Sequence, residues 1–256
     1  TNDDGIDSPG LTAMVRAVQS FCDVLIVAPM NQQTNMGRGG LRGGDIGRIE
    51  KRLISVGEEE VLGYAVNGSP AQAVAHAVIE IADSKPDFCL SGINYGENLG
   101  LAFTCSGKLG AAFVEDSLGI PSIAFSRSMP LNVQKSSDFS SIDWATEEYH
   151  VAELLKKVLK YGLADQVRIL NVNFPSGIDQ STEVRITRQA YMNYGRYVHP
   201  GVRDFNQGQT LNWAMNTQLH EAAPDTDIYA VHFDRIISVT PMSSVMSLSV
   251  HSFLRR

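Results

Sequence analysis

Two hydrophobic patterns alternate along residues 1–175. Short runs of consecutive apolar residues are typical of strands that are buried on both faces of a parallel sheet. Between these runs, apolar residues recur at helical spacing, and the first such stripe follows Ser8 and Pro9, which suit the start of a helix. Strands that alternate with helices predict an α/β fold, a Rossmann-like three-layer core with a mostly parallel sheet. The runs lie at 24–27, 88–90, 122–125 and 167–172, and the helices are expected at 8–18, 69–81, 106–113 and 143–161.

Two stretches of this part carry neither pattern. Residues 30–60 include six glycines between positions 37 and 47, which predicts a mobile surface loop. A glycine-rich loop can also approach a ligand, but Arg42 and Ala102 stand where the dinucleotide-binding and P-loop motifs need glycine. Residues 91–100 are rich in glycine and asparagine and also predict a loop.

The last third of the chain has a different pattern. Residues 184–197 and 228–239 resemble strands without a helical stripe, and a polar stretch that includes Trp213 separates them. We predict an antiparallel β-hairpin extension that makes contacts between subunits. The chain would then divide into a catalytic core at 1–180 and a hairpin and oligomerisation region at 181–256 that returns to the core.

Composition narrows the class of protein. The 256 residues carry a formal net charge of −7 and are 43% hydrophobic, which is typical of a folded domain. No apolar run is long enough to cross a membrane, and scattered basic residues argue against a nucleic-acid groove. Cys22, Cys89 and Cys105 form no CxxC motif, so we expect inert core thiols and a cytoplasmic location.

Doubly wound sheets bind their ligands outside the carboxyl ends of the strands, and three polar loops are candidates for that position. One loop carries Asp3 and Asp4, a second carries Thr34, and a third begins at Asn94. Carboxylate, hydroxyl and amide oxygens favour Mg²⁺, Mn²⁺ or Ca²⁺ over zinc. Adjacent carboxylates repel each other unless a cation neutralises them, although two solvated loop residues are the simpler reading of the pair.

A phosphate site is the other chemistry that these loops favour. Ser106 and Gly107 open a predicted helix, whose free N–H groups and positive dipole end attract anions. The glycines at 92, 96 and 100 allow the backbone to approach a ligand closely. Taken alone, an ordinary capped helix and ordinary turns explain both features.

The chain resembles the SurE family of survival-protein nucleotidases in a set of blocks that keep their order along nearly its whole length. The resemblance implies a Rossmann-like core with a C-terminal hairpin, dimers or tetramers, and a metal-dependent phosphatase of nucleoside 5′-monophosphates. It also implies that the activity extends in some members to 3′-monophosphates and short polyphosphate. The blocks are Asn2–Gly5, Ala28–Pro29, Gly68–Ala71, Ser91–Gly100, Ser106–Gly107, Gly110–Ala112, Asn171–Pro175, Thr226–Asp227 and Ser238–Pro241.

Site residues are carried over by position from this resemblance. Asp3 and Asp4 would be the catalytic pair, and Asp3, Asp4, Thr34 and Asn94 would ligate one divalent metal ion per subunit, Mg²⁺ or Mn²⁺, with Ca²⁺ able to replace it in crystals. The partners would be nucleoside monophosphates and further copies of the chain, with no nucleic-acid polymer and no membrane. The phosphate would be bound by Asn94, Gly96, Asn98, Ser106, Gly107 and Lys108.

Three departures from the family pattern affect this site. The family usually has serine and glycine where Thr34 and Asn35 stand, and threonine where Lys108 stands. An ammonium group near the phosphate would favour anion binding. The family also has a buried strand before its Asn-Asp-Asp-Gly block, so we expect such a strand to precede Thr1.

These departures leave alternatives open. One is a non-catalytic nucleotide- or phosphate-binding protein on the same scaffold, and another is a structural oligomeric module that binds no metal. His199, His220 and His232 lie in the hairpin region and would reach the site only if that region folds back or is exchanged between subunits.

Overall fold

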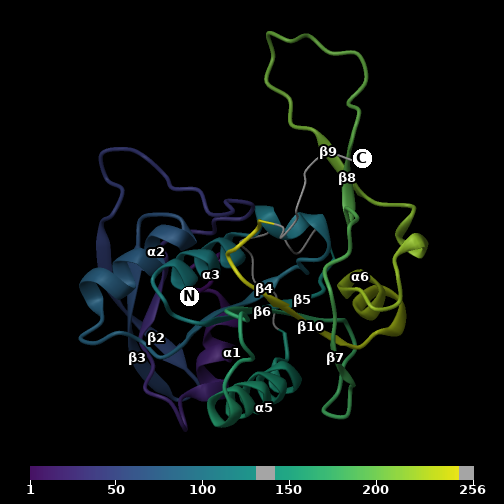
Figure 1. Ribbon diagram of the computed structural model, residues 1–256. Coiled ribbons are helices and arrows are strands. Elements are labelled where there is room, and N and C mark those ends of the chain that lie inside the picture. Colours follow the sequence, from purple (N-terminus) through teal and green to yellow (C-terminus); the bar gives the residue numbers. More distant parts are fainter. Residues whose placement is uncertain (131–141, 248–256) are drawn as a thin grey trace.

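The computed structural model describes residues 1–130 and 142–247 and is shown in Figure 1. Residues 131–141 of the predicted core and residues 248–256 of the predicted hairpin region lie outside the described residues. The helices are α1 (Pro9–Val18), α2 (Pro70–His76, continued by a π-helical turn at Ala77–Ile81), α3 (Gly107–Ser117), α5 (Ala145–Tyr161) and α6 (Asp227–Tyr229, continued by a π-helical turn at Ala230–Asp234), with 3₁₀ turns at Leu101–Cys105 and Leu219–Glu221. The strands are β1 (Ile26–Pro29), β2 (Ile49–Val56), β3 (Glu59–Val66), β4 (Cys89–Tyr95), β5 (Ser122–Arg127), β6 (Ile169–Phe174), β7 (Val184–Ile186), β8 (Gly195–Val198), β9 (Asn212–Met215) and β10 (Ile237–Met242).

The core strands form two sheets. The larger has the order β4-β5-β6-β10-β7, in which β4, β5 and β6 are parallel and β10 runs antiparallel to β6. The smaller has the order β1-β3-β2, with β1 parallel to β3. Thr1 lies beside β4, where its amine donates to the Leu90 carbonyl at 2.9 Å and its carbonyl accepts from Gly92 N–H at 2.9 Å. The expected strand before Thr1 stays a prediction.

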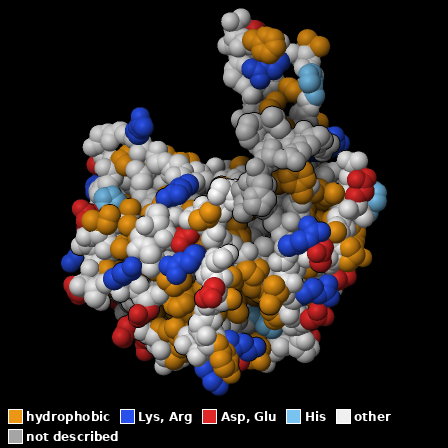
Figure 2. Space-filling view, in the orientation of Figure 1, with side chains coloured by type: hydrophobic (Ala, Val, Ile, Leu, Met, Phe, Trp, Pro, Cys, Tyr) orange, Lys and Arg blue, Asp and Glu red, His pale blue; other side chains and the backbone are white. Residues whose placement is uncertain are grey.

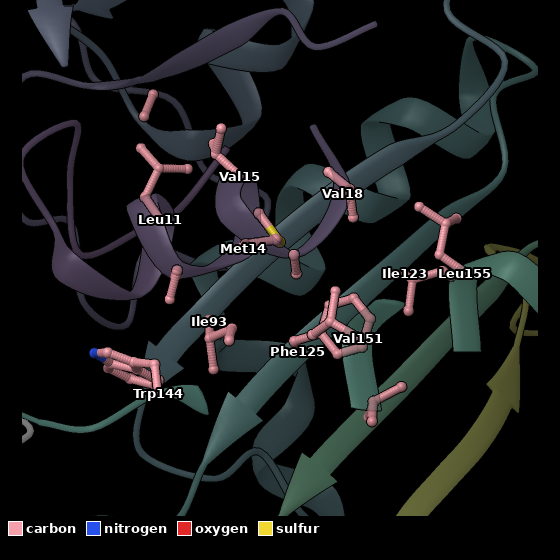
Figure 3. Close-up of a cluster of buried hydrophobic side chains, with 14 of the residues drawn as sticks. Leu11, Met14, Val15, Val18, Ile93, Ile123, Phe125, Trp144, Val151 and Leu155 are labelled. Atoms are coloured by element: carbon pink, nitrogen blue, oxygen red, sulfur yellow. The ribbon is translucent and has the colours of Figure 1, made fainter. Parts of the chain in front are cut away.

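Helices cover both faces of the larger sheet (Figure 1). Helices α1 and α5 pack together on one face, and α2 and α3 pack together on the other. The α1 backbone lies directly on β4, since a Cβ at Gly10 would stand 1.9 Å from the Ile93 carbonyl oxygen. The predicted α/β three-layer core is therefore confirmed. Figure 3 shows the core between α1, α5 and the sheet, built from Leu11, Met14, Val15, Val18, Ile93, Ile123, Phe125, Trp144, Val151 and Leu155.

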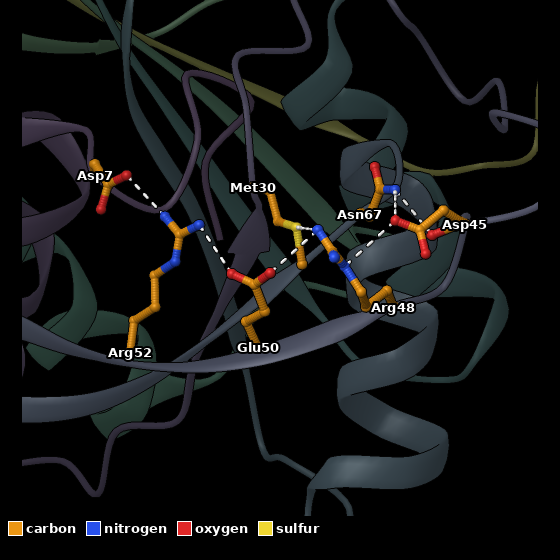
Figure 4. Close-up of polar contacts among 7 residues, drawn as sticks. All are labelled: Asp7, Met30, Asp45, Arg48, Glu50, Arg52 and Asn67. Atoms are coloured by element: carbon orange, nitrogen blue, oxygen red, sulfur yellow. Dashed lines mark hydrogen bonds and ion pairs between the residues drawn. The ribbon is translucent and has the colours of Figure 1, made fainter.

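The expected loop at 30–60 is wrong over its second half, because β2 begins at Ile49 and pairs antiparallel with β3. In β2 only Ile54 and Val56 are buried, so the strand lacks the continuous apolar run that marks the others. Figure 4 shows the charges that line its solvent side. Arg52 bridges Glu50 and Asp7 at 3.2 and 2.9 Å. The ion pair with Asp7 thereby connects the β2–β3 hairpin to the loop that follows Asp4.

Other sequence predictions fail in detail. The expected loop at 91–100 begins as strand, since β4 continues to Tyr95 with buried residues. The expected strand at 228–239 begins as helix, because α6 and its π-helical turn run to Asp234 before β10 starts. Cys105 is exposed and Cys22 and Cys89 are half-buried, so none of them is the fully buried core thiol that we expected.

An antiparallel hairpin is confirmed in this region and projects from the body of the molecule (Figures 1 and 2). Its second strand, β9, lies in the stretch that we expected to be a polar connection, and the two segments that we expected to be strands pair in parallel through β7 and β10. Strands β8 and β9 pair from Gly195 with Met215 to Val198 with Asn212. The hairpin carries apolar side chains into solvent, among them Tyr197 at 73% and Phe205 at 88% exposure. Over the described ranges, no helix combines the length and the apolar character needed to cross a bilayer.

Candidate active site

The loop of Asp3 and Asp4 meets two other predicted loops at one edge of the sheets. The Asp4 carboxylate accepts hydrogen bonds from Tyr95 N–H at the end of β4, at 2.9 Å, and from Gln32 Nε2 after β1, at 3.0 Å. The backbone of the same loop is fixed by Gln33 N–H, which donates to the Asp3 carbonyl at 2.7 Å. Sequence positions 3–4, 32–33 and 95 are thus brought together as their strand ends predict.

The side chain of Asn2 fixes the conformation of this loop through three hydrogen bonds. Its side-chain oxygen accepts from Asp4 N–H at 3.0 Å, which is the local turn that asparagine favours. Its Nδ2 donates to Ser8 Oγ and to the Ile93 carbonyl, both at 3.2 Å. Ser8 therefore stands at the N-cap of α1 as predicted, but its hydroxyl binds Asn2 and does not cap the helix.

Both aspartates are buried, with 4% of each side chain exposed. Burial, together with the charge of the neighbouring Asp3, raises the pKa of Asp4 from 3.8 to about 7. Burial likewise raises the pKa of Asp3, against the charge of Lys108 and the backbone amides of Gly107 and Lys108. Oδ1 of Asp3 has no hydrogen-bond partner among the described residues. A buried carboxylate oxygen without a donor is costly, so the pair favours a cation or a proton.

The start of α3 faces Asp3. Ser106 caps this helix, since its Oγ accepts from Leu109 N–H at 3.3 Å. Gly107 lies against the aspartate, and a Cβ at this position would stand 2.9 Å from Asp3 Cβ and Oδ2. Only glycine lets the helix N-terminus come this close. The positive end of the helix dipole and the carboxylate pair therefore share one site.

Lys108 places a cation in the same site. Its side chain is fully buried, and within the part of the chain that the structure describes its Nζ has no hydrogen-bond partner. Burial lowers its pKa from 10.5 to about 8, while the charges of Asp3, Asp4 and Glu97 oppose this shift. The ammonium form is therefore still the main form at neutral pH.

The remaining predicted phosphate residues lie beside this cluster, at the ends of β5 and β6. Asn98 Nδ2 donates to Ser126 Oγ at 3.3 Å and to the Gly96 carbonyl at 3.2 Å. Its backbone N–H donates to Asn173 Oδ1 at 2.8 Å. Asn94 is buried, and its Nδ2 donates to the Gly96 carbonyl at 3.1 Å, which leaves its amide oxygen as the group that a cation would use.

Thr34 is exposed, and nothing in the structure connects its hydroxyl to Asp3 or Asp4. The residue after it, Asn35, has a φ of 64°, in the left-handed region that asparagine tolerates better than most residues. Asn35 therefore adopts the left-handed backbone conformation that a glycine at this position would adopt freely. Whether Thr34 ligates a metal stays a prediction.

Sequence reasoning missed a second group of polar residues, Glu97, Tyr194 and His232, of which Glu97 also interacts electrostatically with Lys108. The Glu97 charge acts on Lys108 and on His232. Burial raises the pKa of Tyr194, and Glu97 adds to this shift. The Tyr194 hydroxyl lies 3.5 Å from His232 Nδ1. His232 thus approaches the site within one chain, whereas His199 and His220 are exposed. These residues lie about a hundred positions apart, and no local pattern links them.

Asp227 anchors this second group to the rest of the site. Its carboxylate accepts from the backbone N–H groups of Gly100, Ala190 and Ile228 at 2.8 to 2.9 Å. It therefore fixes the end of the segment that carries Glu97 and Asn98. The sequence showed Asp227 only as part of a family block, without this role.

The donor set fits a divalent metal in part. The orphaned Oδ1 of Asp3, the Asp4 carboxylate and the Asn94 amide oxygen are the hard ligands that Mg²⁺ and Mn²⁺ prefer. Among the described residues, no three His, Cys, Asp or Glu side chains gather to hold a metal. A metal here would therefore keep several waters, as Mg²⁺ usually does.

Comparison with known proteins identifies the family of this chain. The family model described as Survival protein SurE matches residues 1–196. A protein of Methanocella arvoryzae named 5′-nucleotidase SurE is 38% identical over 245 residues, covering 94% of this chain and 90% of its own. Another of that name from Methanosphaera stadtmanae is 34% identical, over 98% and 96% of the two chains. The crystal structure of the SurE protein from Aquifex aeolicus has a TM-score of 0.72 and 29% identity, over 96% and 92% of the chains. The chain belongs to the SurE family.

Proposed function

We propose that this protein is a phosphomonoesterase that hydrolyses nucleoside 5′-monophosphates with the help of one divalent metal ion. The relatives named 5′-nucleotidase SurE support the reaction class, since they match nearly the whole chain. The observation that carries the proposal is the meeting of the Asp3–Asp4 pair with the N-terminus of α3, which puts a candidate cation site beside an anion site.

Asp3, Asp4 and Asn94 would hold the metal, with Thr34 as the further ligand that the family resemblance implies. When bound, the metal supplies positive charge to a phosphate oxygen and lowers the pKa of a bound water. Gln32 and Tyr95 orient the Asp4 carboxylate through the hydrogen bonds described above, and Asn2 fixes the backbone of Asp4. No nucleophilic side chain is needed, because water attacks phosphorus and the P–O bond to the nucleoside breaks.

The N-terminus of α3 would stabilise the charge that spreads over the phosphate oxygens during this reaction. The Ser106 hydroxyl and the backbone N–H groups that follow it are already fixed by the helix. Asn98 is fixed by Ser126 and Asn173 and would bind a further phosphate oxygen. Gly107 keeps the backbone free of a Cβ that would collide with Asp3.

The proposal is tested by phosphate release from a panel of nucleoside 5′-monophosphates, with Mg²⁺, with Mn²⁺ and with EDTA. We expect turnover that the chelator abolishes and that returning the metal restores. A 3′-monophosphate and tripolyphosphate in the same assay test the wider activity that the family resemblance implies. Binding of nucleotide without turnover under any metal would support the non-catalytic alternative and overturn the proposal.

We further propose that the projecting hairpin joins copies of this chain into a dimer or tetramer. Its support is the exposure of Tyr197, Val202 and Phe205, which a single copy leaves in solvent. Sedimentation or light scattering of the intact chain measures the assembled mass, and a monomer at micromolar concentration would contradict this assignment.

A further inference from the structure

Lys108 is the fully buried cation of the candidate site, and nothing in the fold pairs with it directly. No described residue forms a hydrogen bond or ion pair with its Nζ, although Asp3, Asp4 and Glu97 are its charged neighbours. Buried ammonium groups normally pair closely with a carboxylate, because desolvation costs several kilocalories per mole. An unpartnered ammonium held among carboxylates therefore indicates space for a group that is absent here.

The fold holds this ammonium rigidly. Lys108 lies in the first turn of α3, between Gly107, which contacts Asp3, and Leu109, whose N–H is bound by the cap at Ser106. Helix α3 in turn packs on β4 and β5. The backbone of Lys108 thus belongs to the same packed unit as the aspartates and the helix N-terminus, and its side chain is buried within that unit.

Such a cation has two opposite effects on possible ligands. It repels a divalent metal at the Asp3–Asp4 pair, because like charges in a buried site interact strongly. It attracts an oxyanion that binds between it and the N-terminus of α3, through a charge-assisted hydrogen bond. The geometry therefore favours the phosphate group and disfavours the metal.

Resting on the function proposed above, we propose that Lys108 is a built-in cation of the active site that weakens divalent-metal binding and itself binds the phosphate group of the substrate. The metal-free protein then keeps affinity for phosphate. The metal then neutralises a smaller share of the negative charge of the phosphate than it would in a site without the lysine.

The variants Lys108→Met and Lys108→Thr test this inference. Methionine keeps much of the buried volume without the charge, and threonine provides a second variant if the first misfolds. Lys157→Met is the matched control, since it removes the same charge from an exposed position on α5. Circular dichroism and thermal melts establish that each variant folds.

Two binding measurements are made on each protein without any assay of turnover. Calorimetric titration with Mn²⁺ should show affinity about tenfold or more higher in both Lys108 variants than in the wild type, equal to about 1.4 kcal/mol per factor of ten. Titration with inorganic phosphate in EDTA should show binding to the wild type and to Lys157→Met, and at least tenfold weaker binding to the Lys108 variants.

Unchanged or weaker Mn²⁺ binding in both folded Lys108 variants would overturn the inference, as would undiminished phosphate binding. Asp4→Asn separates this failure from failure of the proposed function. If Asp4→Asn loses Mn²⁺ while the Lys108 variants bind it as the wild type does, only the role of Lys108 is wrong. If Asp4→Asn binds Mn²⁺ normally, the metal lies elsewhere and both proposals fall.

Discussion

Buried carboxylates occur at two places beside the segment that carries Glu97 and Asn98. Asp227 is one of them and the Asp3–Asp4 pair is the other, and they differ in how many hydrogen-bond donors they have. Asp227 accepts three backbone N–H groups at 2.8 to 2.9 Å. Asp3 and Asp4 lie next to each other, Asp3 has an oxygen without any donor, and their nearest cation stops short of an ion pair. Both groups are equally hidden from solvent, with 1% of Asp227 and 4% of each other aspartate exposed.

The difference shows what each group does. A buried carboxylate with all its donors in place stabilises the fold, and removing it leaves N–H groups unpaired. A buried carboxylate pair with too few donors lowers the stability of the free protein unless a ligand binds it. The contacts of Asp227 are therefore those of a structural carboxylate, and Asp3 and Asp4 are the pair to which we assign the chemistry in the proposed function.

The largest expected effect separates the two groups by activity. Asp3→Asn and Asp4→Asn should each lower kcat/KM for a nucleoside 5′-monophosphate by about a thousandfold, because each removes a charge that would hold the metal. Their melting temperatures without metal should be equal to or above that of the wild type, since a repulsion is lost. Steady-state kinetics with saturating Mn²⁺ and thermal melts measure both. Near-normal turnover in Asp4→Asn would contradict the assignment of Asp3 and Asp4 as the residues that hold the metal.

The pH dependence of stability gives the next effect. The folded-state pKa of Asp4 lies near 7, above its ordinary 3.8, so the folded protein binds more protons than the unfolded chain between these values. The free energy of unfolding without metal should therefore fall as pH rises from about 4 to 8, by a few kcal/mol. Asp4→Asn should flatten this fall, and added Mn²⁺ should offset it at the upper end. Denaturant titrations at several pH values in EDTA measure the slope, and equal slopes in wild type and variant would contradict the shift.

Asp227→Asn should have the reverse profile of the first variants. An asparagine places an NH₂ group opposite at least one of the three backbone donors, so the free energy of unfolding should fall by about 2 kcal/mol. Activity should fall less, about tenfold, through the loosened segment at 96–100. Asp225→Asn, at an exposed neighbouring carboxylate that pairs with Arg188, is the matched control. An Asp227 variant as stable as this control would remove the distinction between the two groups.

The sequence predicted the three-layer core because its main strands are buried on both faces, which gives unbroken apolar runs. It also predicted that the loop of Asp3 and Asp4 lies close to the segment that begins at Asn94, since ligand-binding loops gather at the carboxyl ends of the strands, and Asp4 does accept from Tyr95 N–H. It missed β2 because only Ile54 and Val56 of that strand are buried, so its pattern resembles that of a loop.

Residues that act over long sequence distances could not be found in this way. Lys108 was expected near the phosphate, but its complete burial depends on packing that no local spacing encodes. Glu97, Tyr194 and His232 meet only because Asp227 and β7 bring the hairpin region back to the core. Such contacts follow from the tertiary fold, and the periodicity of a single sequence does not predict them.

The projecting hairpin provides the baseline for this comparison, because its tip contacts neither carboxylate group. Phe205 is 88% exposed, so Phe205→Ser should change the free energy of unfolding by less than about 0.5 kcal/mol and leave kcat/KM unchanged within each protomer. If the hairpin joins subunits, the same substitution should lower the assembled mass measured by light scattering. A loss of activity together with unchanged mass would mean that the hairpin acts on the site itself, and the two carboxylate groups could then no longer be treated as separate from it.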